Sequence, residues 1–432
     1  MSTAIIELWG TTIGYVSMDA DETFARFEYE PNFVAMNVEI APIMMPARSG
    51  QIFRFPDIHP RSFHGLPGLL ADSLPDKYGQ KLINIWLAQT GRTAKSFNAV
   101  DRLCYTGKRG MGALEFTPEM RNDGLSKDRK LEVSQLTELA SMAFAKKETL
   151  DLKLDEMKNE NTLFEILSVG TSAGGARAKA VIAYDPSTQQ VRSGQLDLPK
   201  GFEHWLIKFD GVEFNGDWGV SDPLGYGLLE YSYYEMAKQC DINMMESRVF
   251  SENGRNHFMT RRFDRSKDGS KSFIQTFAAL MHYDYYESGY YSYEQLIMLM
   301  KQLDMPMETM EQQFRRIVFN IVGCNQDDHV KNFAFMMNRQ GKWDLTPAYD
   351  LCHSEGSEFT QNHQLSLNGK VNHFAKEDFK YLADYIGLPR GRHKRILEQT
   401  IEVFSAWSTL AIELGIPENI QNHVNKTLRL KW

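Results

Sequence analysis

Two aspartates and an asparagine in the segment 323–350 have the types and spacing needed to transfer a phosphoryl group. Asp327 and Asn332 are five positions apart, the spacing of a kinase catalytic loop, in which the Asp accepts a hydroxyl proton and the Asn holds Mg²⁺. A predicted hairpin then leads to Asp350, where a kinase places its main metal-binding carboxylate. Phosphoryl transfer depends on metal ions and a positioned nucleophile. We therefore expect Asp327 to be the base, and Asn332 and Asp350 to be the metal ligands.

Other interpretations of this loop are open at the level of sequence. Asp and Asn also cap helix ends and turns, and Asp328 competes for the base role, although only Asp327 has the spacing to Asn332. His329 is expected to position the loop or contact phosphate rather than transfer protons, and Lys331 lies in the same loop. No His or Cys cluster has the spacing of a zinc site.

A glycine-rich turn at 171–179 is the candidate phosphate-binding element. Adjacent Gly174 and Gly175 let backbone N–H groups approach phosphate oxygens, and Arg177 and Lys179 add positive charge. The segment is not a Walker A motif, because no Gly-Lys-Ser/Thr follows at the required spacing. The alternative interpretation is a tight turn before a strand.

Lys208 is a cation within the apolar strand expected at His204–Phe209. A buried ammonium needs an anionic partner, for which a phosphate and Glu230 are candidates. The alternative is a lysine that protects an edge strand from aggregation. The segment Phe258–Arg265 is expected to end a strand at a lobe junction, where an adenine-binding hinge would lie, or else to be a solvated, charged strand end.

Helices and strands must position these residues. The periodicity of apolar residues along the chain predicts an α+β protein of two lobes. The amino-terminal part is predicted to be rich in strands and the carboxyl-terminal part mainly helical. Strands are expected at Ile5–Trp9, Ile13–Met18, Phe24–Tyr29, Ala180–Tyr184, His204–Phe209, Ser247–Ser251 and His257–Arg262, with a hairpin at Phe333–Met337 and Lys342–Leu345. Helices are expected at Lys77–Gln89, Leu131–Ala145, Asn161–Leu167, Leu228–Cys240, Tyr293–Gln302, Glu308–Val322, Lys376–Tyr385 and Arg390–Leu414.

Composition narrows the class of protein. The chain has 432 residues, 42% hydrophobic and 24% charged, which excludes collagen-like and largely disordered proteins. A net charge of −8 gives no global attraction to nucleic acid or an anionic membrane. Four isolated cysteines, no signal peptide and no membrane-length apolar run predict a soluble, cytoplasmic protein. The aromatic segment Tyr283–Tyr293 contains no Lys or Arg and is interpreted as a packed surface or protein-contact loop.

Several motifs follow one another in a fixed order along the chain. They are Gly65–Asp76 (GLPGLLADSLPD), Gly110–Leu114 (GMGAL), Gly174–Lys179 (GGARAK), Lys208, Arg261–Arg265 (RRFDR), Asp327 with Asn332, and Asp350. Together they resemble the HipA family, the serine/threonine kinase toxins of bacterial toxin–antitoxin modules, over most of the chain. The resemblance implies a two-lobed kinase-like fold with lipid-kinase-like connectivity. It divides the chain into an amino-terminal subdomain (1–130), a kinase amino-terminal lobe (131–272) and a helical lobe (273–432).

The resemblance also implies an ATP- and Mg²⁺-dependent protein kinase. Ser172 occupies the place of the serine whose autophosphorylation inactivates family members, since a dianionic phosphate cannot sit where ATP phosphates bind. Nucleotide contacts would come from the phosphate turn, the lysine, the hinge and the catalytic loop. These residues are Gly174, Gly175, Ala176, Arg177, Ala178, Lys179, Lys208, Arg261, Arg262, Phe263, His329, Lys331 and Tyr349.

The implied partners are a HipB-like helix-turn-helix antitoxin and a protein substrate, such as an aminoacyl-tRNA synthetase, whose modification would halt translation. DNA contact would then be indirect, through the antitoxin, and no membrane is involved. The sequence departs from the family at Ala178 (Pro in the closest loop variant), Arg177 (Gln in the best-known members) and Arg261 (Glu in those members). Two alternatives are a catalytically silent co-repressor module bound to the antitoxin and a small-molecule or lipid kinase.

Overall fold

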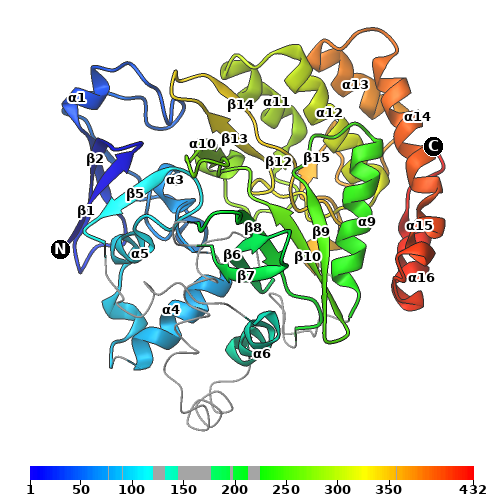
Figure 1. Ribbon diagram of the computed structural model, residues 1–432. Coiled ribbons are helices and arrows are strands. Elements are labelled where there is room, and N and C mark those ends of the chain that lie inside the picture. Colours follow the sequence, from blue (N-terminus) through cyan, green and yellow to red (C-terminus); the bar gives the residue numbers. More distant parts are fainter. Residues whose placement is uncertain are drawn as a thin grey trace. The chain divides into compact units, whose positions relative to one another are not determined.

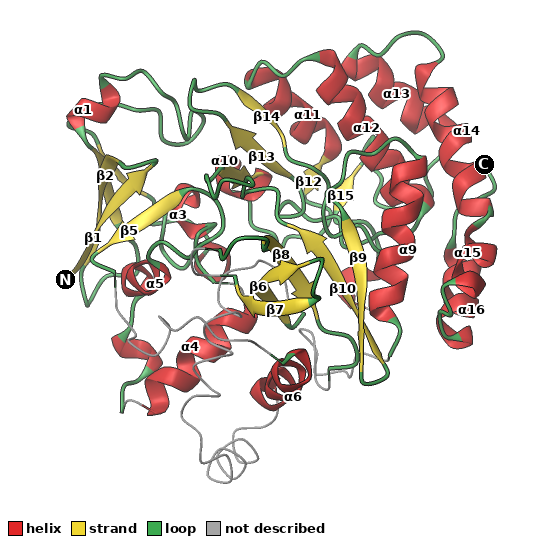
Figure 2. Ribbon diagram, in the orientation of Figure 1, coloured by secondary structure: helices red, strands yellow, loops and turns green. Residues whose placement is uncertain are grey.

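The computed structural model describes residues 1–75, 77–89, 91–119, 132–144, 177–194, 198–212, 224–356 and 358–432 (Figure 1). The chain forms two compact units. The first, here the sheet unit, comprises Met1–Gly227 and Ser247–Phe273, and the second, here the helical unit, comprises Leu228–Glu246 and Ile274–Trp432. The expected α+β composition, with a β-rich amino-terminal part and a helical carboxyl-terminal part, is confirmed (Figure 2).

The sheet unit begins with an antiparallel five-stranded sheet in the order β4-β3-β2-β1-β5. Side chains alternate along β1, where Ala4, Ile6 and Leu8 are buried, because successive residues of a strand point to opposite faces. The strands are β1 Ser2–Leu8, β2 Thr11–Met18, β3 Arg26–Tyr29, β4 Ile52–Arg54 and β5 Leu114–Thr117. The accompanying helices are α1 Pro31–Val34, α2 Pro60–Phe63, α3 Gly68–Ala71, α4 Lys77–Gln89 and α5 Ala99–Thr106, with a 3₁₀ turn at Ala94–Ser96.

A second antiparallel sheet in the same unit has the order β7-β6-β8-β10-β9. Its central strand β8 buries Trp205 and Ile207 against Leu136 and Ala140 of α6, which form part of one apolar cluster. The elements are α6 Val133–Phe144, β6 Lys179–Asp185, β7 Gln190–Ser193, β8 Glu203–Lys208, β9 Ser247–Glu252 and β10 Arg255–Arg261. The helix expected at Asn161–Leu167 lies outside the described residues.

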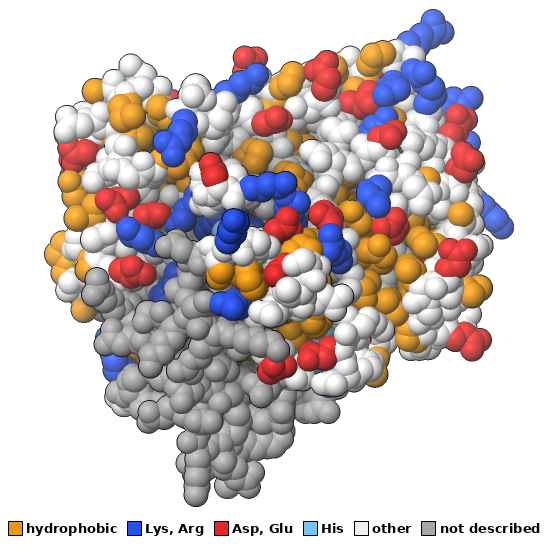
Figure 3. Space-filling view, in the orientation of Figure 1, with side chains coloured by type: hydrophobic (Ala, Val, Ile, Leu, Met, Phe, Trp, Pro, Cys, Tyr) orange, Lys and Arg blue, Asp and Glu red, His pale blue; other side chains and the backbone are white. Residues whose placement is uncertain are grey.

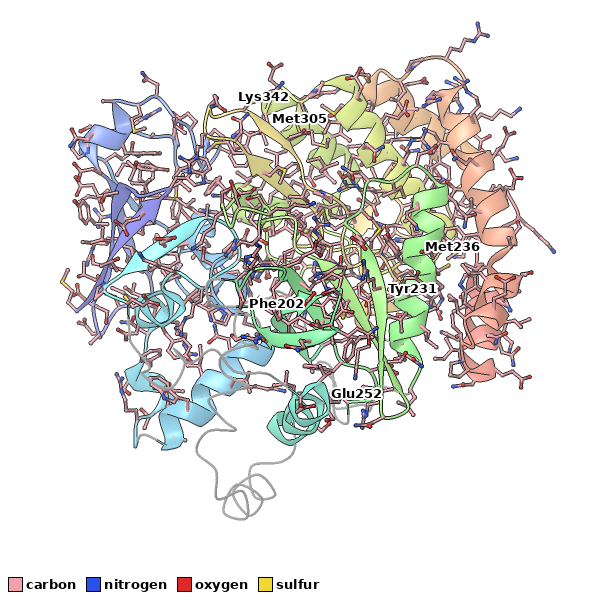
Figure 4. The ribbon with its side chains drawn as sticks, in the orientation of Figure 1. Phe202, Tyr231, Met236, Glu252, Met305 and Lys342 are labelled. Carbon is pink, nitrogen blue, oxygen red and sulfur yellow. The ribbon has the colours of Figure 1, made fainter. Side chains whose placement is uncertain are left out.

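The helical unit is built around α12, whose side chains are buried along most of its length. Met236 of α9, labelled in Figure 4, is also buried. The helices are α9 Tyr226–Gln239, which starts in the sheet unit, α10 Phe277–Met281, α11 Tyr293–Gln302, α12 Met307–Val322, α13 Lys376–Ile386, α14 Arg392–Ser405, α15 Trp407–Glu413 and α16 Glu418–Thr427. Small sheets join β11 Phe273–Thr276, β13 Ala334–Met337 and β14 Trp343–Leu345, and pair β12 Tyr291–Ser292 with β15 Leu365–Ser366.

The single helix expected over Arg390–Leu414 is wrong, because the chain forms α14 and α15 with a break at Ala406. The break places Trp407 in the core, where its indole Nε1 donates to Ser232 Oγ at 3.2 Å. In the described part of the chain, no helix combines the length and apolarity needed to cross a bilayer. Figure 3 shows acidic and basic side chains interspersed over the face in view.

Candidate functional site

The candidate catalytic loop begins where α12 ends. Gly323 closes the helix, and a Cβ on it would lie 2.3 Å from the Phe404 ring, so the packing there admits only glycine. Cys324 then adopts a left-handed backbone conformation, φ 51°, and turns the chain out of the helix. The loop therefore starts from a rigid, fully buried support.

A short parallel bridge between Asn325 and Ser354 closes the loop. Gln326 N–H donates to Ser354 O at 2.9 Å, and Ser354 N–H donates to Cys324 O at 3.0 Å. The two hydrogen bonds join the residues just before Asp327 to those just after Asp350. The chain between them carries the predicted base and both predicted metal ligands.

Asp327 and Asn332 are tied together through the backbone. Asn332 Nδ2 donates to the carbonyl oxygen of Asp327 at 2.6 Å, and Asn332 N–H donates to His329 O at 2.8 Å. Because the amide nitrogen is used in this way, Oδ1 of Asn332 is the atom suited to a metal ion. The carboxylate of Asp327 is 44% exposed, so an incoming hydroxyl group can reach it.

Asp328 has the opposite environment, since it is fully buried. Its carboxylate accepts hydrogen bonds from Gln364 N–H at 2.7 Å, from His363 Nδ1 at 2.7 Å and from the Tyr293 hydroxyl. Burial, together with the nearby Asp328 charge, raises the pKa of Tyr293 well above its ordinary value, which keeps that hydroxyl protonated as a donor. A carboxylate enclosed by three donors has no access to substrate, so the geometry favours Asp327 over Asp328 as the base.

His329 and Lys331 shape the same loop. The backbone N–H of Lys331 donates to His329 Nδ1 at 3.2 Å, which leaves the proton of a neutral imidazole on Nε2, 3.7 Å from Asp327 Oδ1. The hydroxyl of Tyr349 donates to Lys331 O at 2.7 Å, and the Lys331 ammonium lies 4.7 Å from the centre of the Tyr285 ring. These contacts agree with the expected loop-positioning role of His329.

Asp350 follows the predicted hairpin. In that hairpin Phe335 pairs with Leu345, and Thr346 N–H donates to Ala334 O at 3.1 Å. Asp350 has a positive φ of 51°, a conformation that Asp tolerates better than most residues. Its carbonyl oxygen accepts from Asn325 Nδ2 at 3.4 Å, which is a further link between Asp350 and the loop.

In the sheet unit, two lysines occupy directly opposite positions. Lys179 of β6 pairs in register with Lys208 of β8, so both side chains project from the same face of the sheet. Phe258 of β10 continues the row, and the Lys208 ammonium lies 5.8 Å from its ring centre. Because β8 is the third of five strands, the edge-strand interpretation of Lys208 is wrong. Lys208 and Glu230 belong to different units, so their pairing stays a prediction.

Arg177 and Ala178 connect the predicted phosphate turn to β6. The guanidinium of Arg177 stacks over the ring of Tyr226 at 4.2 Å, and Phe209 N–H donates to Ala178 O at 3.0 Å. The rest of the turn, with Ser172, Gly174, Gly175 and Ala176, lies outside the described residues. The contacts therefore place the end of the turn beside the end of β8.

The predicted hinge residues have different roles from one another. Arg262 is buried and binds Asp264 through two hydrogen bonds of 2.9 and 2.7 Å, so the solvated strand-end interpretation is wrong for it. Arg261 lies 3.9 Å from the carboxylate of Glu203 and is partly exposed, as is Phe263. The ion pair gives Arg262 a structural contact within the predicted hinge, and its contact with a nucleotide stays a prediction.

The donor set fits a magnesium ion better than a transition metal. Asn332 and Asp350 offer oxygen ligands, which Mg²⁺ prefers, and Mg²⁺ commonly takes only one or two protein carboxylates and completes its shell with phosphate and water. Among the described residues, no group of three or more His, Cys, Asp and Glu side chains could hold a metal by itself.

Three residues that matter to these geometries were not predicted from the sequence. His363 reaches Asp328 across 35 positions, Arg429 reaches His363 across 66 positions, and Asp264 reaches Gly112 across 152 positions. A local motif carries no signal for such pairings. Only the RRFDR segment that contains Asp264 could have drawn attention to one of them.

Comparisons with known proteins agree with this architecture. The chain matches the family model "HipA-like C-terminal domain" over residues 171–407 and the model "HipA N-terminal domain" over residues 4–117. No curated protein sequence matches the chain. Its fold is similar to that of HipA from Shewanella oneidensis MR-1, solved with HipB and operator DNA, at TM-score 0.68 and 16% identity, covering 98% of this chain and 95% of that chain. The Helicobacter pylori proinflammatory kinase CtkA matches at TM-score 0.32 and 12% identity, covering 56% of this chain and 94% of its own, which is too distant to inform the fold.

Proposed function

The chain belongs to the HipA family, and we propose that it is an ATP- and Mg²⁺-dependent protein serine/threonine kinase that acts as the toxin of a toxin–antitoxin module. The observation that carries this proposal is the closed loop of the helical unit. Asn332 is bonded to the Asp327 backbone, and the Asn325–Ser354 bridge holds the Asp350 segment beside the loop. Base and metal ligands are thus fixed on one rigid support.

In the proposed mechanism, the exposed carboxylate of Asp327 accepts the proton of a serine or threonine hydroxyl as that oxygen attacks the γ-phosphorus of ATP. The bond from the γ-phosphorus to the β–γ bridging oxygen breaks, and ADP leaves. Oδ1 of Asn332 and the carboxylate of Asp350 would hold Mg²⁺, which neutralises the phosphate oxygens. His329 keeps the loop in shape through its Nδ1 contact with Lys331.

Lys179 and Lys208 would bind the phosphates of ATP from the sheet unit. Like charges directly opposite each other across a sheet repel, and an anion between them relieves that repulsion. Arg177, the backbone of Gly174 to Ala178 and the partly exposed hinge residues Arg261 and Phe263 would complete the nucleotide site. We assign Arg262 to the support of this hinge through Asp264.

We further propose the regulation and partners that the family suggests. Phosphorylation of Ser172 would place a dianion in the nucleotide phosphate site and so inactivate the enzyme. The Shewanella relative was solved with HipB and operator DNA, which supports a HipB-like antitoxin partner. A net charge of −8 favours DNA contact through that partner. The substrate would be a cytoplasmic protein such as an aminoacyl-tRNA synthetase. The chain would divide into an amino-terminal subdomain (1–130), a kinase amino-terminal lobe (131–272) and a helical lobe (273–432).

The test is phosphate transfer from γ-labelled ATP by the purified chain, with Asp327→Asn as the decisive variant. Loss of the base should lower the rate of transfer to protein by about 10²–10⁴-fold. Asp384→Asn is the matched control, because Asp384 is exposed on α13, and it should transfer phosphate like the wild type. Chelation of Mg²⁺ should stop transfer, and mass spectrometry of the product should find phosphate on Ser172.

Three outcomes would contradict the proposal. Full transfer by Asp327→Asn would rule out Asp327 as the base. Label that appears on a small molecule but never on protein would identify a metabolite kinase instead. An absence of ATP turnover by the wild-type chain would favour a silent co-repressor module.

A further inference from the structure

The chain that follows α16 caps the helix that leads into the catalytic loop. Arg429 N–H donates to Val322 O at 3.0 Å, and Arg429 Nη1 donates to Ile321 O at 3.0 Å. Both carbonyl groups belong to the last turn of α12, where no N–H group of the helix itself can satisfy them. A cation at this position also interacts favourably with the negative end of the helix dipole.

The same guanidinium determines which ring nitrogen of the buried His363 donates. Arg429 Nη1 lies 2.6 Å from His363 Nε2, and an arginine can only donate, so Nε2 must be the acceptor. The proton of the imidazole is then on Nδ1, which lies 2.7 Å from Asp328 Oδ2. His363 therefore donates to Asp328 in a single tautomer.

This chain of hydrogen bonds ends at the residue next to the proposed base. The side chains of His363 and Asp328 are both fully buried, and Asp328 also accepts from Tyr293 and from Gln364 N–H. In a buried network of this kind each bond strengthens its neighbours, and one missing member leaves a costly unsatisfied group. The hydrogen bonds thus run without interruption from Arg429 through His363 to Asp328.

Further contacts hold Arg429 in place. Its second terminal nitrogen donates to Asn372 Oδ1 at 3.1 Å, and the guanidinium lies over the Phe374 ring at 5.6 Å. Two positions earlier, Thr427 O accepts from Cys324 Sγ at 2.7 Å, and Trp432 packs edge-on against Phe379. The segment 427–432 is thus fixed on both sides of Arg429.

We propose that Arg429 and His363 are positioning residues for phosphoryl transfer, which hold the catalytic loop in its working geometry through Asp328. The catalytic part of this inference rests on the proposed kinase function. Arg429 joins the end of α12 to the interior of the loop, so the backbone of Asp327 is held from both directions. Neither residue needs to touch ATP or substrate.

The kinetic test compares Arg429→Ala with Lys431→Ala, a control that removes an exposed cation from the same segment. Arg429→Ala should lower kcat by about 10²-fold, the cost of misplacing a reacting group by about 1 Å, with KM for ATP unchanged. Added guanidinium ions should restore part of kcat to Arg429→Ala, whereas potassium chloride at the same ionic strength should not. Lys431→Ala should match the wild type.

Two histidine variants test the direction of the hydrogen bonds. The side-chain amide of His363→Asn can still donate from the Nδ1 position to Asp328, whereas that of His363→Gln reaches the Nε2 position instead. We expect His363→Asn to keep the higher kcat. Equal losses in the two variants would argue against the donation from His363 to Asp328.

Hydrogen exchange of the segment 324–332 provides a readout that needs no activity. Arg429→Ala should raise exchange there relative to the wild type and to Lys431→Ala. If the wild type transfers no phosphate, the proposed function fails, while this measurement still tests the support of the loop. If Arg429→Ala does not fold, Arg429→Lys, which keeps the charge and loses the planar fork, should show the same effects more weakly. If Arg429→Ala has the same hydrogen exchange and the same kcat as Lys431→Ala, the inference is overturned.

Discussion

Asp327 and Asp328 are neighbours with the same side chain and very different surroundings. Asp327 is 44% exposed, whereas Asp328 is fully buried and accepts from three donors. The spacing to Asn332 predicted Asp327 as the base, and of the two carboxylates Asp327 is the accessible one. The sequence could not assign a role to Asp328, because its partners Tyr293, His363 and Gln364 lie about 35 positions away on either side and meet it only in the folded chain.

Replacement of Asp328 should therefore affect stability more than replacement of Asp327. Asp328→Asn replaces one accepting oxygen by an NH₂ group, which faces either Gln364 N–H or the Tyr293 and His363 donors, and the free energy of unfolding should fall by about 1–3 kcal/mol. Asp327→Asn changes an exposed group and should stay within about 0.5 kcal/mol of the wild type. Chemical denaturation of the two variants measures the difference. Equal stabilities would mean that the buried network contributes little.

At the scale of elements, Asp210 joins three parts of the sheet unit. Its carboxylate accepts from the backbone N–H groups of Gly225 at 3.0 Å and Gly227 at 3.3 Å, where α9 begins, and from Asn256 N–H of β10 at 3.3 Å. Asp210 lies just after the end of β8. Its own backbone N–H donates to His257 Nδ1 at 2.9 Å, which fixes Asp210 beside β10. The start of α9 is thereby held against β10, the strand that leads to the predicted hinge.

Gly227→Ala should disrupt this junction. A Cβ at position 227 would lie 1.8 Å from the backbone oxygen of Asn256, and backbone atoms cannot move aside as a flexible side chain can. We expect a loss of about 1–3 kcal/mol in unfolding free energy, typical of overpacking. Gly356→Ala is the matched control, because its nearest neighbour is the Thr360 hydroxyl at 3.3 Å. Thermal melting compares the two, and an unchanged midpoint for Gly227→Ala would contradict this packing.

Sequence periodicity predicted single elements well and their pairings poorly. The helices expected at Lys77–Gln89 and Tyr293–Gln302 have the predicted bounds, since apolar spacing and clear start or stop residues define them. The break at Ala406 was missed because neither Pro nor Gly marks it. The alignment of Lys179 with Lys208 depends on strand register, which local pattern does not determine.

At the scale of the whole chain, Asp264 connects the two sheets of the sheet unit. Gly112 N–H donates to Asp264 Oδ2 at 2.8 Å, and Arg265 donates to Gly110 O at 2.8 Å and to Gly112 O at 3.0 Å. Burial alone would raise the pKa of Asp264, but the charges of Arg262 and Arg265 outweigh it and hold that pKa well below its usual range. The motif Gly110–Leu114 is thus bonded to the predicted hinge.

Asp264→Asn should destabilise the sheet unit by about 3–5 kcal/mol at neutral pH, because it leaves two buried arginines without their counter-ion. In the wild type the pKa of Asp264 is lower in the folded chain than its ordinary 3.8. Its contribution is therefore complete above that value and is lost as the pH falls below it. Urea denaturation over this pH range should show a steeper loss in the wild type than in Asp264→Asn. Parallel curves would contradict the assignment.

The bridge between Asn325 and Ser354 also bears on how the proposed enzyme could be switched. The proposed base Asp327, Asn332 and Asp350 lie on one segment of the chain, and the bridge joins the two ends of that segment. The bridge lies wholly within the helical unit, so the position of this segment is set by that unit alone. Control by an antitoxin or by phosphorylation of Ser172 would then change the binding of ATP, while the segment that carries Asp327 would keep its geometry.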